Sequence, residues 1–355
     1  MNFHELSLLN INFNFINGIW VTYSDFPNDI DIYGSHQRNP DRWTKINFQQ
    51  LKTGNSTYLK FNSPRNFMHF RILYSGIINE KNNHPIISLD ITQPLSPDEI
   101  KYHLGNSKIT FVGCARNCIS KIDESINVLL SLGKAFSDYK IIIFENDSND
   151  GTQNRLAELA KENIIELIQF RNLDISFPLR TQRLSFARNQ LLSKAISIDN
   201  EYYCVADLDG VIGNEFDTSS FFSNFKYLNC WDAVLPVNKG IYYDVWAFRH
   251  PSLWPWDYER EMNAASPILE DSNLLDFYVS RFQNINFRNL KGWLNVDSAF
   301  GGMGLYKLKK FKYSNYFGLS NQNQLCEHTI FHEKSKTFDA QIYINPEFIV
   351  NGISK

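Results

Sequence analysis

The chain has 355 residues, of which 43% are hydrophobic and 21% charged, and its formal net charge at pH 7 is −3. This length predicts two domains, or one large domain with an appendage, and the composition is that of a globular rather than a disordered protein. A net charge this small excludes a general electrostatic attraction to nucleic acid or anionic lipid, so no nucleic-acid partner is expected.

The five cysteines, Cys114, Cys118, Cys204, Cys230 and Cys326, include no C-x-x-C pair. They predict neither a disulfide framework nor a zinc site, and reduced core thiols of a cytoplasmic protein are the better interpretation. The N-terminal segment lacks a basic region and a cleavage site, and no stretch reaches the roughly 18 apolar residues that a membrane span needs. We expect a soluble, cytoplasmic protein. Loose association with the inner face of a membrane and a homo-oligomeric state both stay open.

Residues 1–105 are expected to form a small accessory domain rich in β-structure. Short runs such as "GIWVTY", "STYLKF" and "PIISLDI" alternate with turn-forming segments rich in Asn, Asp, Gly and Pro. This pattern is typical of a small sandwich or a partial barrel. Pro94 and Pro97 in "TQPLSPDEI" mark the predicted boundary.

Residues 106–355 are expected to form a second domain that alternates strand, turn and helix. Strands are predicted at "KITFVGCARN", "YKIIIFEND", "IIELIQF" and "EYYCVAD". Helices are predicted at "QNRLAELAKEN", at "RLSFARNQLLSKAIS" and after Cys118, where Ser120 and Asp123 have capping-box spacing. This alternation indicates an α/β fold with a mostly parallel sheet and helices on both faces. Between about 211 and 300 the pattern breaks down, and we expect long irregular segments that carry function.

Three polar clusters follow predicted strands: "CARN", "ENDSNDGT" and "DLDG". Because ligands bind beyond the carboxyl ends of strands in an open α/β sheet, we expect the clusters at one edge. Asp207 and Asp209 in "DLDG" suit Mg²⁺ or Mn²⁺. Phosphates of the substrate complete the coordination shell of such an ion. Asp29 and Asp31 have the same spacing without comparable neighbours, so spacing alone indicates nothing. The alternative for Asp207 and Asp209 is a solvated acidic turn.

In order and spacing these motifs resemble the nucleotide-sugar half of GT-A glycosyltransferases, for which the family 2 enzymes are a good comparison. The likeness runs through "FVGCARN", "IIIFENDSNDGT", "LSFARNQLLSKA" and "YYCVADLDG" to "VDSAFGGMGLYKLKKF" and "LCEHTIFHEKSKTFDAQIYINPEF", roughly residues 106–350. "FENDSNDGT" with the downstream Cys-Glu-His resembles, more loosely, the capsule-type mannosyltransferases. The resemblance implies a GT-A, Rossmann-like fold.

The resemblance also implies a nucleotide pocket, whose members would be Ala115, Arg116, Glu145, Asp147, Arg183, Arg188 and Asp207. Carboxylates there accept hydrogen bonds from ribose or base, and guanidinium groups bind a diphosphate well. For Asp147 the alternative is turn chemistry, with Gly151 taking a positive φ. For Arg188 the alternative is capping or solvation of its helix.

As metal ligands the resemblance implies Asp207, Asp209 and a histidine nearer the C-terminus. Only His328 and His332 can be that histidine, and they lie at i and i+4 on one helical face. A structural role is the alternative for either histidine, and for His332 above all.

The catalytic base is where the chain departs from the family 2 pattern. That pattern is Glu-Asp, with the Asp as general base, whereas here Glu327 is followed by His328. His328 is either a base or a metal ligand. If it binds the metal, the base is Glu327 or Asp297, or the reaction has no enzymic base and retains configuration.

The segment "NKGIYYDVWAFRHPSLWPWDYE" has the composition of a glycan site, because aromatic faces stack on sugars and carboxylates accept hydroxyl hydrogen bonds. We expect Asp244, Trp246 and Arg249 to contact sugar. The alternative is a hydrophobic subcore that buries Trp246. Gly301 and Gly302 would let the backbone approach donor or acceptor closely.

Together these features predict a metal-dependent glycosyltransferase with Mn²⁺ or Mg²⁺ as cofactor. Its partners would be a nucleotide-sugar donor, GDP- or UDP-linked, and a glycan or glycolipid acceptor. A product in bacterial capsule or lipopolysaccharide rests on analogy alone. The alternatives are a nucleotidyltransferase acting on sugar phosphates, and a non-catalytic glycan-binding protein whose binding module is the N-terminal β region.

Overall fold

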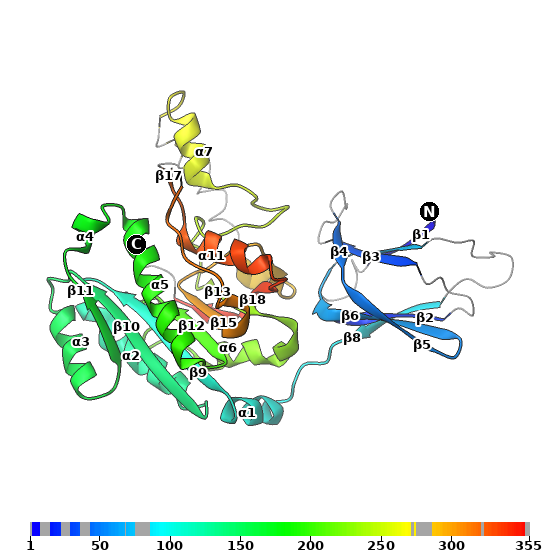
Figure 1. The fold of residues 1–355 in the computed structure, drawn as a ribbon, viewed down its shortest axis with the longest axis horizontal. Helices are drawn as coiled ribbons and strands as arrows, with labels where there is room; N and C mark the ends of the chain where they lie inside the picture. Colours follow the sequence, from blue (N-terminus) through cyan, green and yellow to red (C-terminus); the bar gives the residue numbers. More distant parts are fainter. Residues whose placement is uncertain are drawn as a thin grey trace. The chain divides into compact units, whose positions relative to one another are not determined.

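The computed structural model describes residues 2–7, 15–22, 29–35, 43–67, 69–74, 86–270, 273–274, 286–320 and 323–351. The chain falls into two compact units (Figure 1). Unit 1 comprises Met1–Pro94, Tyr227–Cys230 and Lys291–Trp293, and unit 2 comprises Leu95–Lys226, Trp231–Leu290 and Leu294–Lys355. The predicted domain boundary at residue 105 stays a prediction, although helix α1 (Pro97–Gly105) belongs to unit 2.

Unit 1 consists of antiparallel strands, which confirms the predicted β-rich region. Its strands are β1 (Asn2–Ser7), β2 (Ile16–Thr22), β3 (Ile30–Ser35), β4 (Thr44–Ile46), β5 (Phe48–Thr53), β6 (Ser56–Arg65), β7 (His69–Tyr74) and β8 (Ile86–Ile91). They form two four-stranded sheets, in the orders β1-β7-β3-β4 and β5-β6-β2-β8. Ile19 and Leu59 of one sheet and Ile32 and Phe70 of the other share one buried cluster, so the sheets form a sandwich.

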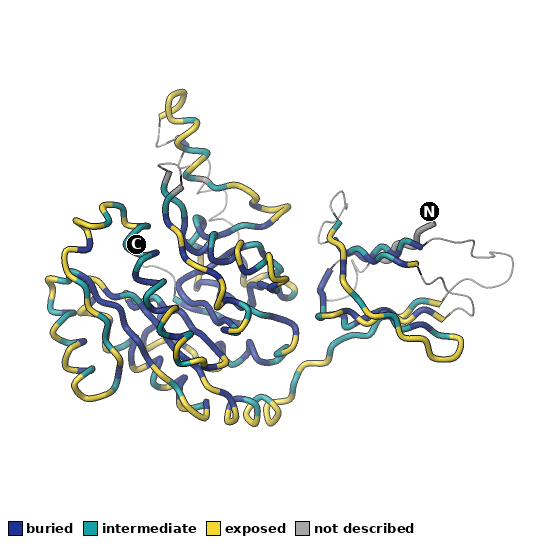
Figure 2. The backbone as a smooth tube through the Cα atoms, in the orientation of Figure 1, coloured by how far each residue is buried: buried dark blue, intermediate teal, exposed yellow. Residues whose placement is uncertain are grey.

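Alternation of buried and exposed residues explains this packing (Figure 2). Along β2, Ile19 and Val21 are fully buried, whereas Trp20 and Thr22 are exposed. Along β6, Leu59 is buried and Lys60 is exposed. Each strand therefore gives one face to the core and one to solvent, as the period of two in a strand requires.

Unit 2 is built on an eight-stranded sheet. Its strands are β9 (Lys108–Ala115), β10 (Asp138–Asn146), β11 (Glu166–Phe170), β12 (Tyr202–Ala206), β13 (Ala233–Asn238), β14 (Leu294–Asn295), β15 (Met303–Lys307) and β18 (Ile342–Val350). Their order is β11-β10-β9-β12-β15-β13-β18-β14. The first four strands are parallel, as is the pair β13–β18, whereas β15 runs antiparallel to both neighbours. This confirms the predicted α/β fold with its mostly parallel sheet.

Helices cover both faces of this sheet. The described helices from α1 onward are α1, α2 (Ile119–Gly133), α3 (Thr152–Lys161), α4 (Leu173–Ser176), α5 (Arg180–Ile198), α6 (Thr218–Phe222), η1 (Ser223–Cys230), α7 (Tyr258–Ala265), η3 (Phe287–Asn289), α10 (Leu308–Phe311) and α11 (Glu327–Lys336). The short strands β16 (Leu319–Ser320) and β17 (Asn323–Gln324) form a hairpin. Val112 packs in one core with Leu191 of α5, and the adjacent Phe111 contacts Phe221 of α6. Neighbouring residues of β9 thus face different helices.

The start of α2 differs from the prediction. Ser120 does not cap it, because the helix begins at Ile119 and Cys118 is its N-cap residue. Two side chains of the "SNDGT" loop satisfy the free amides instead. Thr152 Oγ1 accepts from the Cys118 amide at 2.9 Å, and Asp150 Oδ2 accepts from the Ile119 amide at 3.0 Å. The "ENDSNDGT" loop after β10 therefore holds in place the turn that contains "CARN" after β9.

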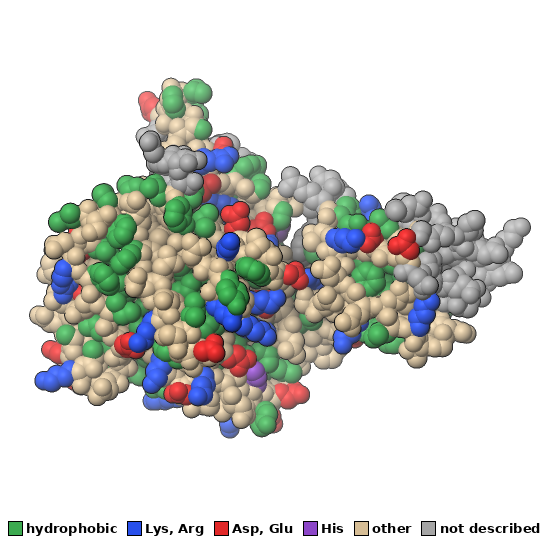
Figure 3. All heavy atoms as spheres, in the orientation of Figure 1, with side chains coloured by type: hydrophobic (Ala, Val, Ile, Leu, Met, Phe, Trp, Pro, Cys, Tyr) green, Lys and Arg blue, Asp and Glu red, His purple; other side chains and the backbone are tan. Residues whose placement is uncertain are grey.

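Regular structure also lies within the segment expected to be irregular. β13 is buried at all six positions and pairs in parallel with β18. Among the described residues, no helix combines the length and apolar character that would let it cross a membrane. On the face drawn in Figure 3, basic and acidic side chains are interspersed, in keeping with the net charge of −3.

Candidate active site

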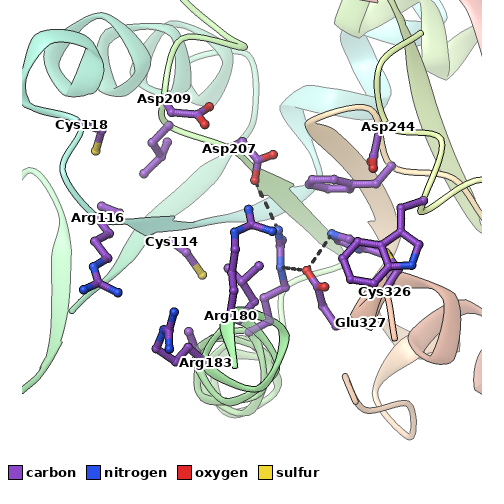
Figure 4. Close-up of a pocket in the computed structure, with 18 of the residues that line it drawn as sticks. Cys114, Arg116, Cys118, Arg180, Arg183, Asp207, Asp209, Asp244, Cys326 and Glu327 are labelled. Atoms are coloured by element: carbon purple, nitrogen blue, oxygen red, sulfur yellow. Dashed lines mark hydrogen bonds and ion pairs between the residues drawn. The ribbon is translucent and has the colours of Figure 1, made fainter. Parts of the chain in front are cut away.

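A cavity of about 540 Å³ lies in unit 2 at the carboxyl ends of β9, β10 and β12 (Figure 4). The predicted site residues that line it are Ala115, Arg116, Arg183, Arg188, Asp207, Asp209, Asp244, Trp246, Glu327 and His328. The predicted residues absent from its lining are Glu145, Asp147, Arg249, Asp297, Gly301 and Gly302. The structure thus brings the strand-end residues together and places several loop residues elsewhere.

The turn after β9 forms one wall. Arg116 is partly exposed there, with its Nη2 atom 3.3 Å from Asp174 Oδ2. The thiols of Cys114 and Cys118 also line the cavity. Burial raises the pKa of Cys114 to about 12 and that of Cys118 to about 11, so both stay protonated at neutral pH. These thiols are therefore not poised to act as thiolate ligands or nucleophiles.

Glu145 and Asp147, assigned by resemblance to the nucleotide pocket, hold the loop after β10. Glu145 is fully buried; Oε1 accepts from the Ser148 amide at 2.9 Å, and Oε2 lies 3.0 Å from Arg171 Nη1. Asp147 has a positive φ of 53°, and its oxygens accept from the backbone amides of residues 172 and 173 at 2.7 and 2.9 Å. Between them, Asn146 reaches the cavity. Their nucleotide role stays a prediction.

Arg188 links the two sides of the cavity. Its Nη2 atom is 3.3 Å from Asp207 Oδ1, and its Nε atom is 3.0 Å from Glu327 Oε1 (Figure 4). The Arg188 side chain is only 5% exposed, and Phe300 lies against the guanidinium, with the ring centroid 4.9 Å from Cζ. Burial opposes the charge of Arg188, but Glu327 and Asp207 outweigh it and raise the pKa of Arg188 above its ordinary value.

Asp207 and Asp209 stand at the end of β12, and the Asp207 amide donates to the Gly302 carbonyl at 2.8 Å. Burial raises the pKa of Asp207 to about 7, opposed by Arg188 and reinforced by Asp209. Asp209 is exposed, and its carboxylate makes no hydrogen bond within the described part of the chain. Two carboxylates with free oxygens facing a cavity fit a hard divalent cation that takes its other ligands from water and phosphate.

His328 and His332 differ in their surroundings. His332 is fully buried and satisfied, with Nδ1 2.9 Å from Ser298 Oγ and Nε2 3.1 Å from the Tyr306 hydroxyl, which is the predicted structural role. His328 stacks on Phe300 at 3.7 Å, and both its ring nitrogens are buried without a hydrogen bond among the described residues. Burial and Arg188 hold the pKa of His328 well below 6.5, so the ring is neutral.

A three-residue metal site is not formed. Over the described ranges, no group of three His, Cys, Asp or Glu side chains is arranged to hold a metal ion. The structure therefore does not join His328 to Asp207 and Asp209 as a preformed ligand set. The membership of His328 in a metal shell stays a prediction.

The segment 243–246 forms the wall opposite β9. Asp244 Oδ2 accepts from the Gly301 amide at 2.9 Å, and burial raises the pKa of Asp244 to about 6. Gly302 has a φ of +95°, and a Cβ there would lie 2.4 Å from Val211 Cγ1. Gly302 therefore permits close packing inside the protein, and the predicted approach of Gly301 and Gly302 to a ligand stays a prediction.

Arg249 and Asp297 lie outside the cavity lining and have structural partners. Arg249 is ion-paired with Asp257 and donates to the carbonyls of Trp246 and Phe248 at 2.9 and 2.7 Å. Asp297 is ion-paired with Lys336. Arg249 thus supports the segment that carries Asp244 and Trp246, and its predicted sugar contact stays a prediction.

The lining residues that were not predicted as site residues include Asn146, Arg180, Tyr243 and Phe300. Asn146 lies inside "ENDSNDGT", and Tyr243 and Phe300 directly precede Asp244 and Gly301, so a search around the predicted residues would have found these three. Arg180 begins α5, two turns before Arg188, and lies on the same side as Arg183 (Figure 4). The hydroxyl of Tyr243 is buried, with no hydrogen bond to any described residue.

No family model matches the chain, and no curated protein matches it. Solved structures do. The mannosyltransferase PcManGT from Pyrobaculum calidifontis in complex with GDP-Man and Mn²⁺ is 13% identical with a TM-score of 0.43, over 69% of this chain and 56% of that one. S. aureus TarS 1-349 in complex with UDP-GlcNAc is 14% identical with a TM-score of 0.40, over 70% of this chain and 58% of that one. M. tuberculosis glucosyl-3-phosphoglycerate synthase is 11% identical with a TM-score of 0.37, over 74% of this chain and 78% of that one.

This chain spans less than three fifths of the length of the first two structures. The predicted likeness to nucleotide-sugar glycosyltransferases is thus also found in the comparison of structures. Because every identity is at most 14% and every TM-score is below 0.5, the function has to be derived from the residues of this cavity.

Proposed function

We propose that this chain is a GT-A type glycosyltransferase that moves a sugar from a nucleotide-diphosphate donor to a hydroxyl of a glycan. One observation carries the proposal: a single cavity at the carboxyl edge of the sheet gathers three aspartates, Asp207 and Asp209 among them, and four arginines. The arginines are Arg116, Arg180, Arg183 and Arg188. Guanidinium groups bind phosphate oxygens, and the carboxylates suit the cation that accompanies a diphosphate.

In this proposal Asp207 and Asp209 hold Mn²⁺ or Mg²⁺ together with oxygens of the donor diphosphate. When bound there, such an ion would stabilise, as a Lewis acid, the charge that collects on the leaving diphosphate. Arg180 and Arg183, at the start of α5, bind the same phosphates from the other side of the cavity. The neutral ring of His328 is not required as a ligand, because waters complete such a shell.

The transfer forms a bond between the acceptor oxygen and the anomeric carbon and breaks the bond from that carbon to the diphosphate. A nucleoside diphosphate leaves, and the hydroxyl proton passes to a base. We assign the base to Glu327, whose Oε2 atom makes no hydrogen bond or ion pair with another described residue, while Oε1 faces Arg188. His328 is a poorer base, because burial and Arg188 disfavour its protonated form. Asp297 lies outside the cavity lining.

The finer identity of the substrates follows only by analogy with the resembled enzymes. It would be a GDP- or UDP-sugar as donor and a capsule or lipopolysaccharide glycan as product. In this proposal Asp244 and Trp246, which line the cavity, would contact the sugars.

The test is a thermal-shift titration of the full chain with GDP, UDP and CMP, each with and without Mn²⁺. We expect one nucleoside diphosphate to stabilise the protein in a metal-dependent manner, since a ligand that binds only the folded state raises its stability. Asp209→Asn should remove the metal-dependent part of the shift and abolish transfer. Asp31→Asn changes the chain's other Asp-x-Asp, and it should leave the metal-dependent shift and the transfer activity unchanged.

No metal-dependent stabilisation by any of the nucleotides would overturn the proposal. Release of pyrophosphate, instead of a nucleoside diphosphate, would identify a nucleotidyltransferase. Glu327→Gln should lower the transfer rate with little change in nucleotide affinity, and an unchanged rate would remove Glu327 as the base.

A further inference from the structure

The solvent-facing side of the sheet β5-β6-β2-β8 in unit 1 carries an arrangement that the proposed reaction does not use. On this face the pairing places Gly18 opposite Lys60 and Asp90, and Trp20 opposite Tyr58 and Ser88. The opposite side of the same strands forms the core of the sandwich. The face is therefore a separate surface, remote in sequence from the catalytic cavity.

Tyr58 lies over Gly18. A Cβ at Gly18 would stand 2.7 Å from Tyr58 Cε2, so only glycine lets the ring rest on the backbone there. The Tyr58 hydroxyl donates to Asp90 Oδ2 at 2.5 Å, across the intervening strand β2. The ring is thus fixed at both ends, by its own strand and by β8.

Trp20 stacks on Tyr58, with the ring centroids 4.5 Å apart and the planes inclined by 19°. Trp20 is 36% exposed. Because Tyr58 covers one face of the indole, the exposed area lies on the opposite face and the edges. Covering Gly18 explains the position of Tyr58, but it does not account for a second, solvent-facing ring stacked on Tyr58.

We propose that Trp20, Tyr58 and Asp90 form a glycan-binding platform on unit 1. A sugar ring would stack its C–H face on the indole, and its hydroxyls would bond with the carboxylate of Asp90 and the ammonium of Lys60 beside the stack. A carboxylate and an ammonium flank the same rings, so the platform fits a neutral oligosaccharide better than an anionic one.

A protein partner fits this face less well. Leu51 and Ile86 are also exposed, but the other outward residues of the four strands are mainly hydroxyl, amide and charged side chains. A stable protein interface buries about 800 Å² on each partner around an apolar, aromatic centre depleted in charged residues. Two stacked rings beside Lys60 and Asp90 match a sugar-sized ligand instead.

The experiment is isothermal titration of the full chain with neutral hexasaccharides of glucose, mannose and galactose. We expect at least one to bind, and Trp20→Ala to weaken that binding about tenfold or more, as for other aromatic anchors. Trp20→Phe, which keeps a ring, should retain most of the affinity. Tyr102→Ala removes an exposed aromatic ring on α1, in unit 2, and should have no effect.

Absence of binding to all three hexasaccharides would overturn the proposal, as would binding that Trp20→Ala leaves unchanged. A second copy or another protein as occupant would appear as a change of sedimentation coefficient in Trp20→Ala, and this too would overturn it. The metal-dependent nucleotide shift should be the same in Trp20→Ala and the parent chain. Failure here is therefore distinct from failure of the proposed transferase activity.

Discussion

Arg188 is the cation on which the buried acids of the cavity depend, since it contacts both Asp207 and Glu327. Arg188→Met should reduce the free energy of unfolding by about 3–5 kcal/mol, because it leaves the buried Glu327 carboxylate and the partly buried Asp207 carboxylate without their counter-charge. Urea denaturation of the metal-free protein measures this cost. Arg155 also pairs with two carboxylates, Asp123 and Glu158, but on the surface, so Arg155→Met should cost much less. Equal costs would contradict a buried ionic bridge.

Asp244 makes the stability of the metal-free protein depend on pH. Its pKa is raised to about 6, so between about pH 4 and pH 6 the folded state keeps a proton that the unfolded state has lost. For this group, the free energy of unfolding is therefore largest below about pH 4, falls as the pH rises through 6, and is level above. Asp244→Asn should reduce the fall, measured by urea denaturation at several pH values in EDTA. Parallel pH profiles for the two proteins would refute the assignment.

Single residues also show where a sequence pattern suffices for the site and where it does not. Residues 207 and 209 could be placed because they directly follow a buried strand, and the carboxyl ends of such strands meet at one edge. The sequence could not show which of Glu145 and Asn146 faces the cavity. Both end β10, but Glu145 turns to Arg171 and Asn146 to the cavity, and this choice depends on partners supplied by another strand end.

At the scale of elements, the start of α5 depends on close packing by Gly318, just before β16. A Cβ at Gly318 would lie 2.2 Å from the Thr181 carbonyl oxygen, which is backbone and cannot rotate away. Gly318→Ala should therefore cost about 1–3 kcal/mol of unfolding free energy and weaken nucleotide binding, since Arg180 and Arg183 occupy the same turn. Denaturation and the thermal-shift titration check the two effects.

Gly105 provides the matched control. It is the last residue of α1, and a Cβ there has open space around it. Gly105→Ala should leave stability unchanged or slightly raised, because alanine favours a helix over glycine. A similar loss in both variants would mean that the contact with Thr181 is not the cause.

The elements that sequence predicted well are those whose pattern is local. The strands and helices from β9 to β12 follow each other with clear periodicity, so both type and order could be read. β13 was missed because its neighbours, β15 and β18, come much later in the chain, and its apolar run "AVLPVN" carries no helical or alternating period. The cap of α2 was missed for a related reason, since Asp150 and Thr152 reach it from the following loop.

At the scale of the whole molecule, the division into two units predicts separable stability. Phe70 is fully buried in the sandwich, so Phe70→Ala should cost about 3–5 kcal/mol there. In hydrogen exchange, β3 and β7 should lose protection while β9, β10 and β12 keep it.

Two observations check this division. Leu51→Ala, on the exposed face of the same sandwich, should change stability by no more than about 0.5 kcal/mol. Loss of protection throughout both units in Phe70→Ala would show that they unfold as one, and the metal-dependent nucleotide shift would then fall with it.

The antiparallel strand β15 also has a consequence for how the chain acquires its site. β15 lies between β12 and β13, and Met303 pairs with Ala206, so this contact closes a loop of about 100 residues. During synthesis the strands β9 to β12 are complete before β15 is made, so their pairing can precede this contact in the nascent chain. A nascent chain stopped before residue 303 ends its sheet at β12, an unpaired edge open to aggregation. In that chain Arg188 has only one of its two carboxylates, because Glu327 has yet to be made.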